Sequence, residues 1–305
     1  MPGRVVEVLS RGTGLSRERG FMAIHQPEKE TAKIPLSDIA VLIVGSGVNL
    51  STNLLLALHE QGAMVVVSGS NFHPASVFWP MGEHTFHCKR LDLQINASLP
   101  LQKRIWQKIV QRKISSQAEV LQALHDKDNG LKAFATRVRS GDPDNLEAQA
   151  ARRYWQTLMG TDFRRRTDPT ETTDPNTLLN YGYAILRASM ARAISASGLH
   201  PALGVHHKNQ SNVFRLVDDL MEPYRPFVDY KVAQWRKHDE KPELTPETKR
   251  QLAAILDIDL CNHAGENSPL SVTMLQVAQS FCTSLEQGTP TLSYPKSILP
   301  STRLL

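Results

Sequence analysis

Residues 198–229 carry the side chains with the clearest potential for chemistry. Their imidazole and carboxylate groups belong to His206, His207, Asp218, Asp219 and Glu222. Neutral imidazole and carboxylate oxygen are ligands for divalent metals, which can fix a phosphate oxygen or a water molecule. Because carboxylates lower the net charge of a site, this mixture suits Mn²⁺ or Mg²⁺ better than a structural Zn²⁺.

Helices before and within this segment must position those groups. The largely apolar run 176–197 predicts the long core helix of the second domain, and a further helix should begin within residues 211–220. Pro223 and Pro226 follow, and each lacks an amide donor and crowds the preceding turn, so a kink or restart is expected there. Glu222, directly before Pro223, should therefore lie at the bend.

An earlier helix is predicted over residues 146–158, with Asp144 or Asn145 as its N-cap. Glu147 and Tyr154 are spaced so that they share one stripe of this helix. A glutamate on a helix surface is ordinarily only a solvated side chain, so this spacing alone assigns it no function.

The first part of the chain has β-strand patterns. A hairpin is expected between strands 4–9 and 21–25, with its turn at residues 12–14, followed by a strand–helix–strand unit with strands 39–44 and 64–67. Ser51 can cap the intervening helix. Gly45 and Gly47 suggest a dinucleotide fingerprint, but its third glycine would fall at Leu50 and the required acidic residue is missing after the second strand.

These patterns predict an α+β fold with a small N-terminal β domain and a larger all-α C-terminal domain, which contains the candidate metal-binding residues. A turn-rich stretch at 71–82 ends the β-rich part, so we place the β-rich domain at 1–85, a linker at 86–98 and the helical domain at 99–305. The 305 residues are 41% apolar, which is enough for a substantial core, and no run is long enough for a membrane span. Three scattered cysteines and the lack of a signal-peptide pattern favour a cytoplasmic protein.

Basic residues cluster more than the formal charge of +5 suggests. One set lies on the helix expected after residue 99, and another lies within residues 137–166. Clustered Arg and Lys suit a DNA phosphate backbone, and a set of solvated helix faces is the alternative interpretation.

Several motifs in a fixed order resemble the Cas1 family, the CRISPR-associated endonucleases and integrases that insert new spacers. They are IPLSDIAVLIV, NLEAQAARRYW, NYGYAILRA, GLHPALGVHH and LVDDLMEPYRPFVD. The resemblance covers nearly the whole chain, and the doubled histidine followed by KNQSN is most similar to members that accompany Cas9-type systems.

The resemblance implies a catalytic metal, Mg²⁺ or Mn²⁺, bound by Glu147, His207 and Glu222, with Asp219 as the alternative third ligand. It implies a metal-dependent DNA endonuclease and integrase in which a 3′-hydroxyl attacks a phosphodiester of the CRISPR repeat, as part of antiviral defence. The implied partners are double-stranded DNA (spacer precursor and repeat), a second copy of the chain in a homodimer, and the small Cas2 protein.

Basic residues that flank these candidates are predicted to contact the DNA backbone. They are Arg152, Arg153, Lys208 and Arg215. A rival hypothesis is a non-catalytic DNA-binding architectural or adaptor protein, which would bind DNA tightly without needing a metal.

Overall fold

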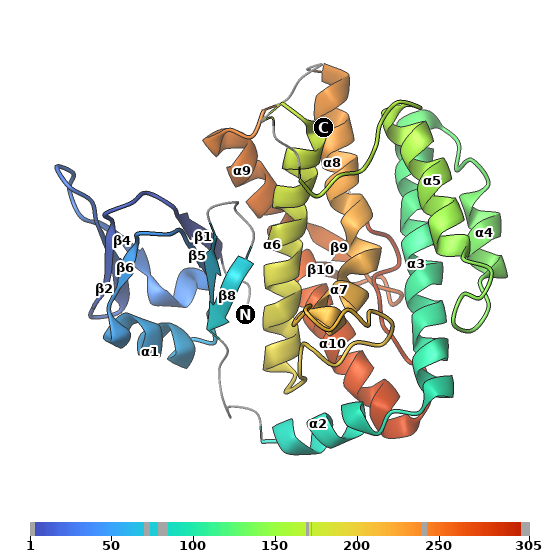
Figure 1. The fold of residues 1–305 in the computed structure, drawn as a ribbon, viewed down its shortest axis with the longest axis horizontal. Helices are drawn as coiled ribbons and strands as arrows, with labels where there is room; N and C mark the ends of the chain where they lie inside the picture. The colour runs from blue at the N-terminus through green and yellow to red at the C-terminus, as the bar shows by residue number, and fades with distance from the viewer. Residues whose placement is uncertain are drawn as a thin grey trace.

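The computed structural model describes residues 4–69, 74–78, 85–168, 171, 173–238 and 243–299. Two β-sheets form the N-terminal part, and helices form most of the remainder (Figure 1). The α+β class predicted from the sequence is therefore confirmed. Helix α6 (Pro175–Ala196) stands between the sheets and most of the C-terminal helices (Figure 1). Side chains of α6 share a buried apolar cluster with the strands β5 (Ile39–Val44) and β7 (Met64–Ser68).

The sheet that faces α6 has the strand order β1-β5-β7-β8. Its strands are β1 (Arg4–Val8), β5 (Ile39–Val44), β7 (Met64–Ser68) and β8 (Pro74–Phe78). The pairs β1–β5 and β5–β7 are parallel, and helix α1 (Thr52–Glu60), capped by Ser51 as predicted, connects β5 to β7. The apolar run of β5 is buried because Val41 faces the helical core and Leu42 faces the second apolar cluster.

The second sheet, of order β4-β3-β2-β6, corrects the expected hairpin. Its strands are β2 (Gly14–Glu18), β3 (Phe21–His25), β4 (Ala32–Pro35) and β6 (Asn49–Leu50). The hairpin joins β2 to β3 and reverses at Arg19, which has a φ of 55°, whereas β1 pairs with β5. Only Leu15 of β2 is a large apolar residue, so alternation could not reveal this strand.

Two segments between the predicted domains also differ from expectation. Strand β8 forms within the stretch read as turn-rich, antiparallel to β7 at the edge of its sheet, where a proline is tolerated. The remainder of that stretch, 71–73 and 79–82, lies outside the described residues. Helix α2 (His87–Ile95) occupies most of the expected linker 86–98, and the division into domains stays a prediction.

The C-terminal part is helical, as predicted, and includes a short β-hairpin. Its helices are α3 (Leu99–His125), α4 (Leu131–Arg137), α5 (Leu146–Met159), α6, α7 (Arg215–Met221), α8 (Arg225–His238), α9 (Pro246–Ala253) and α10 (Leu270–Gln287). The hairpin is β9 (Asp259–Cys261) with β10 (Asn267–Pro269). The 3₁₀ turns among the described residues are η1 (Leu36–Asp38), η2 (Glu222–Tyr224) and η3 (Ala254–Asp257). Within the described ranges, no helix is long and apolar enough to cross a membrane.

The start of α5 is fixed by a residue that sequence inspection did not select. Oxygens of the Asp142 carboxylate accept hydrogen bonds from the backbone N–H groups of Leu146 and Glu147, each at 2.9 Å. Of the two predicted caps, Asn145 does occupy the N-cap position, but it has a left-handed φ of 52° and its side chain makes no capping hydrogen bond, while Asp144 pairs with Arg139. Asp142 therefore satisfies the first amides of α5 and fixes the backbone of Glu147.

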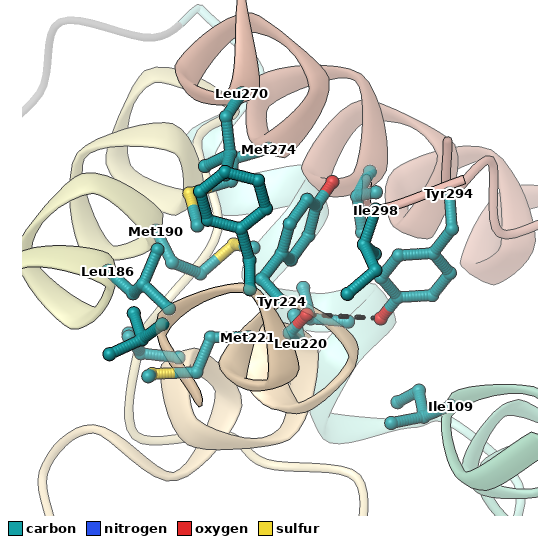
Figure 2. Packing of buried hydrophobic residues seen from close by; sticks show 14 of the residues in the cluster. Ile109, Leu186, Met190, Leu220, Met221, Tyr224, Leu270, Met274, Tyr294 and Ile298 are labelled. Carbon is teal, nitrogen blue, oxygen red and sulfur yellow. Dashed lines mark hydrogen bonds between the residues drawn. The ribbon is translucent and has the colours of Figure 1, made fainter. Parts of the chain in front are cut away.

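The two prolines interrupt the helix as predicted, and α7 passes into the turn η2 before α8 begins. Figure 2 shows how apolar side chains enclose this junction. Leu220, Met221 and Tyr224 are almost fully buried, and the Tyr294 hydroxyl donates a hydrogen bond of 3.1 Å to the Leu220 carbonyl (Figure 2). This packing holds Glu222, which lies between Met221 and Tyr224 in η2.

Candidate active site

A buried lysine of α3 connects two of the predicted ligands. Lys113 Nζ lies 2.6 Å from Glu147 Oε1 on α5 and 2.6 Å from Glu222 Oε2 on η2. The side chains of Lys113, Glu147 and Glu222 are 15%, 23% and 5% exposed. Burial alone would lower the pKa of Lys113, but the two carboxylates outweigh it and raise that pKa, so the ammonium stays charged.

Glu222 is the more deeply buried carboxylate, and it has a second cationic neighbour. Arg225 Nη2 lies 3.2 Å from Glu222 Oε1. Burial would raise the pKa of Glu222, yet Arg225 and Lys113 together lower it to about 2, so the group is ionised at neutral pH. Despite the short contact with Lys113, Oε2 lacks a hydrogen-bond partner of proper geometry among the described residues.

His207 is held in place by the carboxylate of Asp219. Its Nδ1 lies 2.5 Å from Asp219 Oδ1, and the backbone N–H of His207 donates to the same oxygen at 3.3 Å. Asp219 Oδ2 accepts from the N–H groups of Val205, at 2.6 Å, and His206, at 3.0 Å. The Asp219 side chain is 0% exposed, so both of its oxygens are used to shape the loop that carries His207.

Gly204 allows this loop to approach the carboxylate. A Cβ atom at position 204 would lie 2.7 Å from Arg215 Cβ and 2.9 Å from Asp219 Oδ2, closer than side chains are found. A larger residue would push the loop away from the carboxylate. The second glycine of the GLHPALGVHH motif, Gly204, is therefore required at this position for steric reasons.

The two adjacent histidines have different environments. The hydrogen bond with Asp219 raises the pKa of His207, and the charges of Asp219, Glu222 and Asp218 contribute in the same direction, against burial. The His206 ring instead stacks on Trp106 of α3, with ring centroids 4.1 Å apart and planes 2° from parallel. His206 thus packs the loop against α3, whereas His207 pairs with Asp219.

Asp218 is separate from this group, because its Oδ2 accepts hydrogen bonds from Arg187, at 2.6 Å, and Asn212, at 2.7 Å. Of the predicted DNA-contacting residues, Lys208 and Arg215 belong to the segment around His207, and Arg215 is the first residue of α7. Arg152 and Arg153 lie exposed on α5, where Arg153 also contacts the Asn129 carbonyl and stacks over Phe134.

Glu147, His207 and Glu222 carry donor atoms of the kinds that bind a divalent cation. In the part of the chain that the structure describes, no three His, Cys, Asp or Glu side chains are arranged to hold a metal ion. Glu147 and Glu222 nevertheless both contact the ammonium group of Lys113. Oε2 of Glu222 is buried and lacks a hydrogen bond of proper geometry among the described residues. Oxygen, oxygen and imidazole nitrogen form a donor set suited to Mg²⁺ or Mn²⁺, so the residues fit such an ion.

Lys113 was not selected from the sequence, which shows it only as one of several basic residues on a helix. A signal was nevertheless present. Lys113 follows Ile105 and Ile109 at intervals of four, on the stripe of α3 that packs into the core. A charged residue in an apolar stripe must have a partner when it is buried, but the sequence does not identify that partner.

Fold and site together define an α+β protein in which α5 and the turn η2 bring two carboxylates to a buried lysine, while the loop before α7 carries a histidine held by a third carboxylate. A profile of the family described as CRISPR associated protein Cas1 matches residues 6–253. The CRISPR-associated endonuclease Cas1 of Neisseria meningitidis serogroup C (strain 8013) is 39% identical over 253 residues, which is 82% of each chain.

Solved structures share the fold over almost the whole chain. A casposase bound to integration product superposes with a TM-score of 0.75 at 18% identity, covering 99% of this chain and 96% of that one. A Cas6-RT-Cas1–Cas2 complex gives 0.74 at 16% identity, covering 99% of this chain and 36% of that one. These identities are low, so the structures establish the fold alone. The profile and the Neisseria relative establish that the chain belongs to the Cas1 family.

Proposed function

We propose that this protein is a metal-dependent DNA endonuclease and integrase that inserts DNA fragments into a CRISPR array as new spacers. Family membership and the names of its relatives, which are endonucleases, support the class of reaction. The observation that carries the proposal is the convergence of Glu147 and Glu222 on one cation, together with His207, which a buried carboxylate holds in place and whose pKa the charge of Glu222 helps to raise. We place the reaction in the cytoplasm, where the DNA substrate would be available.

The proposed reaction is a phosphoryl transfer. A 3′-hydroxyl of the incoming DNA forms a new bond to a phosphorus of the repeat, and the bond from that phosphorus to the neighbouring repeat strand breaks, which releases that strand with its own hydroxyl. With water as the attacking group, the same site acts as a nuclease. A bound Mg²⁺ or Mn²⁺ would polarise the phosphate and neutralise the charge that develops on its oxygens.

Glu147, His207 and Glu222 would hold the ion. The hydrogen bond between Nδ1 and Asp219 leaves Nε2 of His207 as the ring nitrogen for the metal, an arrangement found at many metal sites. Both oxygens of Asp219 are already engaged, which supports Glu222 as the third ligand and Asp219 as the residue that orients His207. Lys208 and Arg215, next to this loop, are proposed to contact the DNA backbone with Arg152 and Arg153.

The proposed assembly is a homodimer combined with the small Cas2 protein on double-stranded DNA. One structural neighbour is part of a Cas6-RT-Cas1–Cas2 complex, which supports Cas2 as a partner. Another neighbour is bound to an integration product, which supports DNA as a partner. Because phosphate contacts release counterions, DNA binding should weaken steeply as salt is raised.

A strand-transfer assay tests the proposal. The protein, with and without its Cas2 partner, is mixed with a labelled short duplex bearing 3′-hydroxyls and a supercoiled plasmid that contains the repeat, in Mn²⁺, Mg²⁺ or EDTA. We expect joined product only with metal, and loss of that product in Glu147→Gln, His207→Ala and Glu222→Gln while DNA binding persists.

Glu119→Gln is the matched control, since Glu119 has the same 23% side-chain exposure as Glu147 and the same 2.6 Å contact with a cation of α3. It should retain strand transfer. DNA binding without joining in every metal, with and without Cas2, would instead establish the architectural alternative. Loss of activity in Asp219→Ala together with full activity in Glu222→Gln would reassign the third ligand.

A further inference from the structure

The cation between Glu147 and Glu222 belongs to the protein itself. Lys113 Nζ contacts one oxygen of each carboxylate at 2.6 Å, and Arg225 pairs with the other oxygen of Glu222. The two carboxylates, one ammonium and one guanidinium have no net formal charge. A divalent ion that enters between the carboxylates therefore meets a site whose negative charge is already balanced.

We propose that Lys113 is a built-in counter-cation, which holds the carboxylates of Glu147 and Glu222 together in the metal-free protein and is displaced when the divalent ion binds. This inference rests on the proposed function, because it assigns the metal to these two carboxylates. Its physical basis is that two nearby buried carboxylates repel each other and are costly to desolvate without a cation. The flexible four-carbon stem of lysine lets its ammonium leave the carboxylates.

The same helix provides a comparison for this arrangement. Arg112 Nη1 lies 2.6 Å from Glu119 Oε1, and these side chains are 14% and 23% exposed, nearly the same as Lys113 and Glu147. Glu119 also accepts hydrogen bonds from Ser297 and Ile298 of the C-terminal segment, so this second pair anchors the chain. Within the described residues, Arg112 pairs with Glu119 and bridges no second carboxylate, which makes it the matched structural control.

The experiment measures metal binding directly. Mn²⁺ is titrated by calorimetry into the EDTA-stripped wild type, Lys113→Met and Arg112→Met, and the thermal midpoint of each is recorded with EDTA and with Mn²⁺. Lys113→Met removes the competing charge, so we expect it to bind Mn²⁺ about tenfold more tightly, equivalent to about 1.4 kcal/mol. Its midpoint should be below wild type in EDTA and should rise further than wild type when Mn²⁺ is added.

Arg112→Met should also lower the midpoint in EDTA, but its Mn²⁺ affinity and its midpoint shift with Mn²⁺ should equal those of wild type. Lys113→Arg preserves the charge and keeps the test open if Lys113→Met does not fold. The planar fork of arginine can hold both carboxylates at once, so this variant should bind Mn²⁺ more weakly than wild type. Wild-type or weaker affinity in a folded Lys113→Met, or unchanged or tighter affinity in Lys113→Arg, would overturn the proposal.

Failure of this inference is distinguishable from failure of the proposed function. If metal-dependent strand transfer occurs but the affinities do not follow this order, Lys113 is only a structural residue and the integrase proposal stands. If the affinities follow the order but no joined product forms under any condition, the counter-cation is supported and the integrase proposal fails.

Discussion

Replacing Asp219 with asparagine should leave His207 in the chain but remove the contacts that orient its ring. The variant therefore tests whether that orientation is needed for activity. Each Asp219 oxygen contacts two donor atoms, Val205 N and His206 N on one side and two nitrogens of His207 on the other. Asparagine has only one carbonyl oxygen, so its NH₂ group must face one of these pairs. The best arrangement keeps the first pair and turns the NH₂ group towards His207.

The magnitude follows from these contacts. The hydrogen bond to the backbone N–H of His207 is lost, and a bond to a charged group contributes about 1.5–3 kcal/mol. The two retained bonds become neutral ones, which contribute about 1 kcal/mol each. Since Asp219 is 0% exposed, water cannot replace what is lost. We therefore expect the free energy of unfolding to fall by about 3–5 kcal/mol.

Activity should fall for a further reason. The NH₂ group can donate to Nδ1 of His207, which would place the ring proton on Nε2 and prevent that nitrogen from binding a metal. We expect strand transfer and Mn²⁺ affinity to drop on the order of 10–100-fold. Urea unfolding followed by far-UV circular dichroism measures the first effect, and the plasmid assay and calorimetry measure the second.

Asp218→Asn is the neighbouring control. Arg187 and Asn212 both contact Oδ2 of Asp218, so a single amide oxygen can keep both hydrogen bonds, and the loss should be about 1–2 kcal/mol. Equal losses in the two variants, or an Asp219→Asn protein within about 1 kcal/mol of wild type, would refute the reasoning.

Other predictions concern pH and packing. The pKa of His207 in the folded protein is raised above 6.5, so its charged form stabilises the fold below pH 6.5 and this stability is lost as pH rises. Because the ring must be neutral to bind a metal, Mn²⁺ affinity should increase over the same rise in pH. Equal Mn²⁺ affinity at about pH 6 and about pH 8 would contradict this prediction. Burial raises the pKa of Asp229, a partner of the Tyr183 hydroxyl, from 3.8 to about 7. Its protonated form therefore contributes stability that is lost as pH rises between these values, on the order of 4 kcal/mol relative to Asp229→Asn, and parallel pH profiles for the two proteins would exclude it. Gly182→Ala would force a Cβ against the Val228 side chain, so a thermal melt should show a loss of about 1–3 kcal/mol, and an unchanged midpoint would show that α6 and α8 can separate freely.

Features that depend on neighbouring residues in the chain could be predicted from the sequence. The apolar run of β5 and the cap at Ser51 predicted the strand–helix–strand unit correctly. Pro223 predicted the break at Glu222, because a proline has no amide to continue the helix in any environment. The ordered motifs identified the family, and they selected Glu147, His207 and Glu222 as ligand candidates without showing how these are held.

Structural features that depend on contacts with other parts of the chain were not predicted. Strand β2 has a single large apolar residue, and its place between β3 and β6 arises from pairing. Asn145 occupies the predicted N-cap position of α5, but the capping hydrogen bonds are accepted by Asp142, three residues earlier in the chain.

Only the tertiary structure decided which hydrogen bonds and ion pairs hold the candidate site residues. From the sequence, Glu222 was the predicted third ligand and Asp219 its alternative. The buried Asp219 accepts hydrogen bonds from the amides of the loop and contacts the ring of His207, so it supports His207. Lys113 is 34 positions from Glu147, and only the packing of α3 against α5 and η2 brings its ammonium between two carboxylates. The physical reason is that a sequence shows which residues carry charge, whereas the energy of a buried charge depends on which opposite charge the fold places within a few ångströms of it.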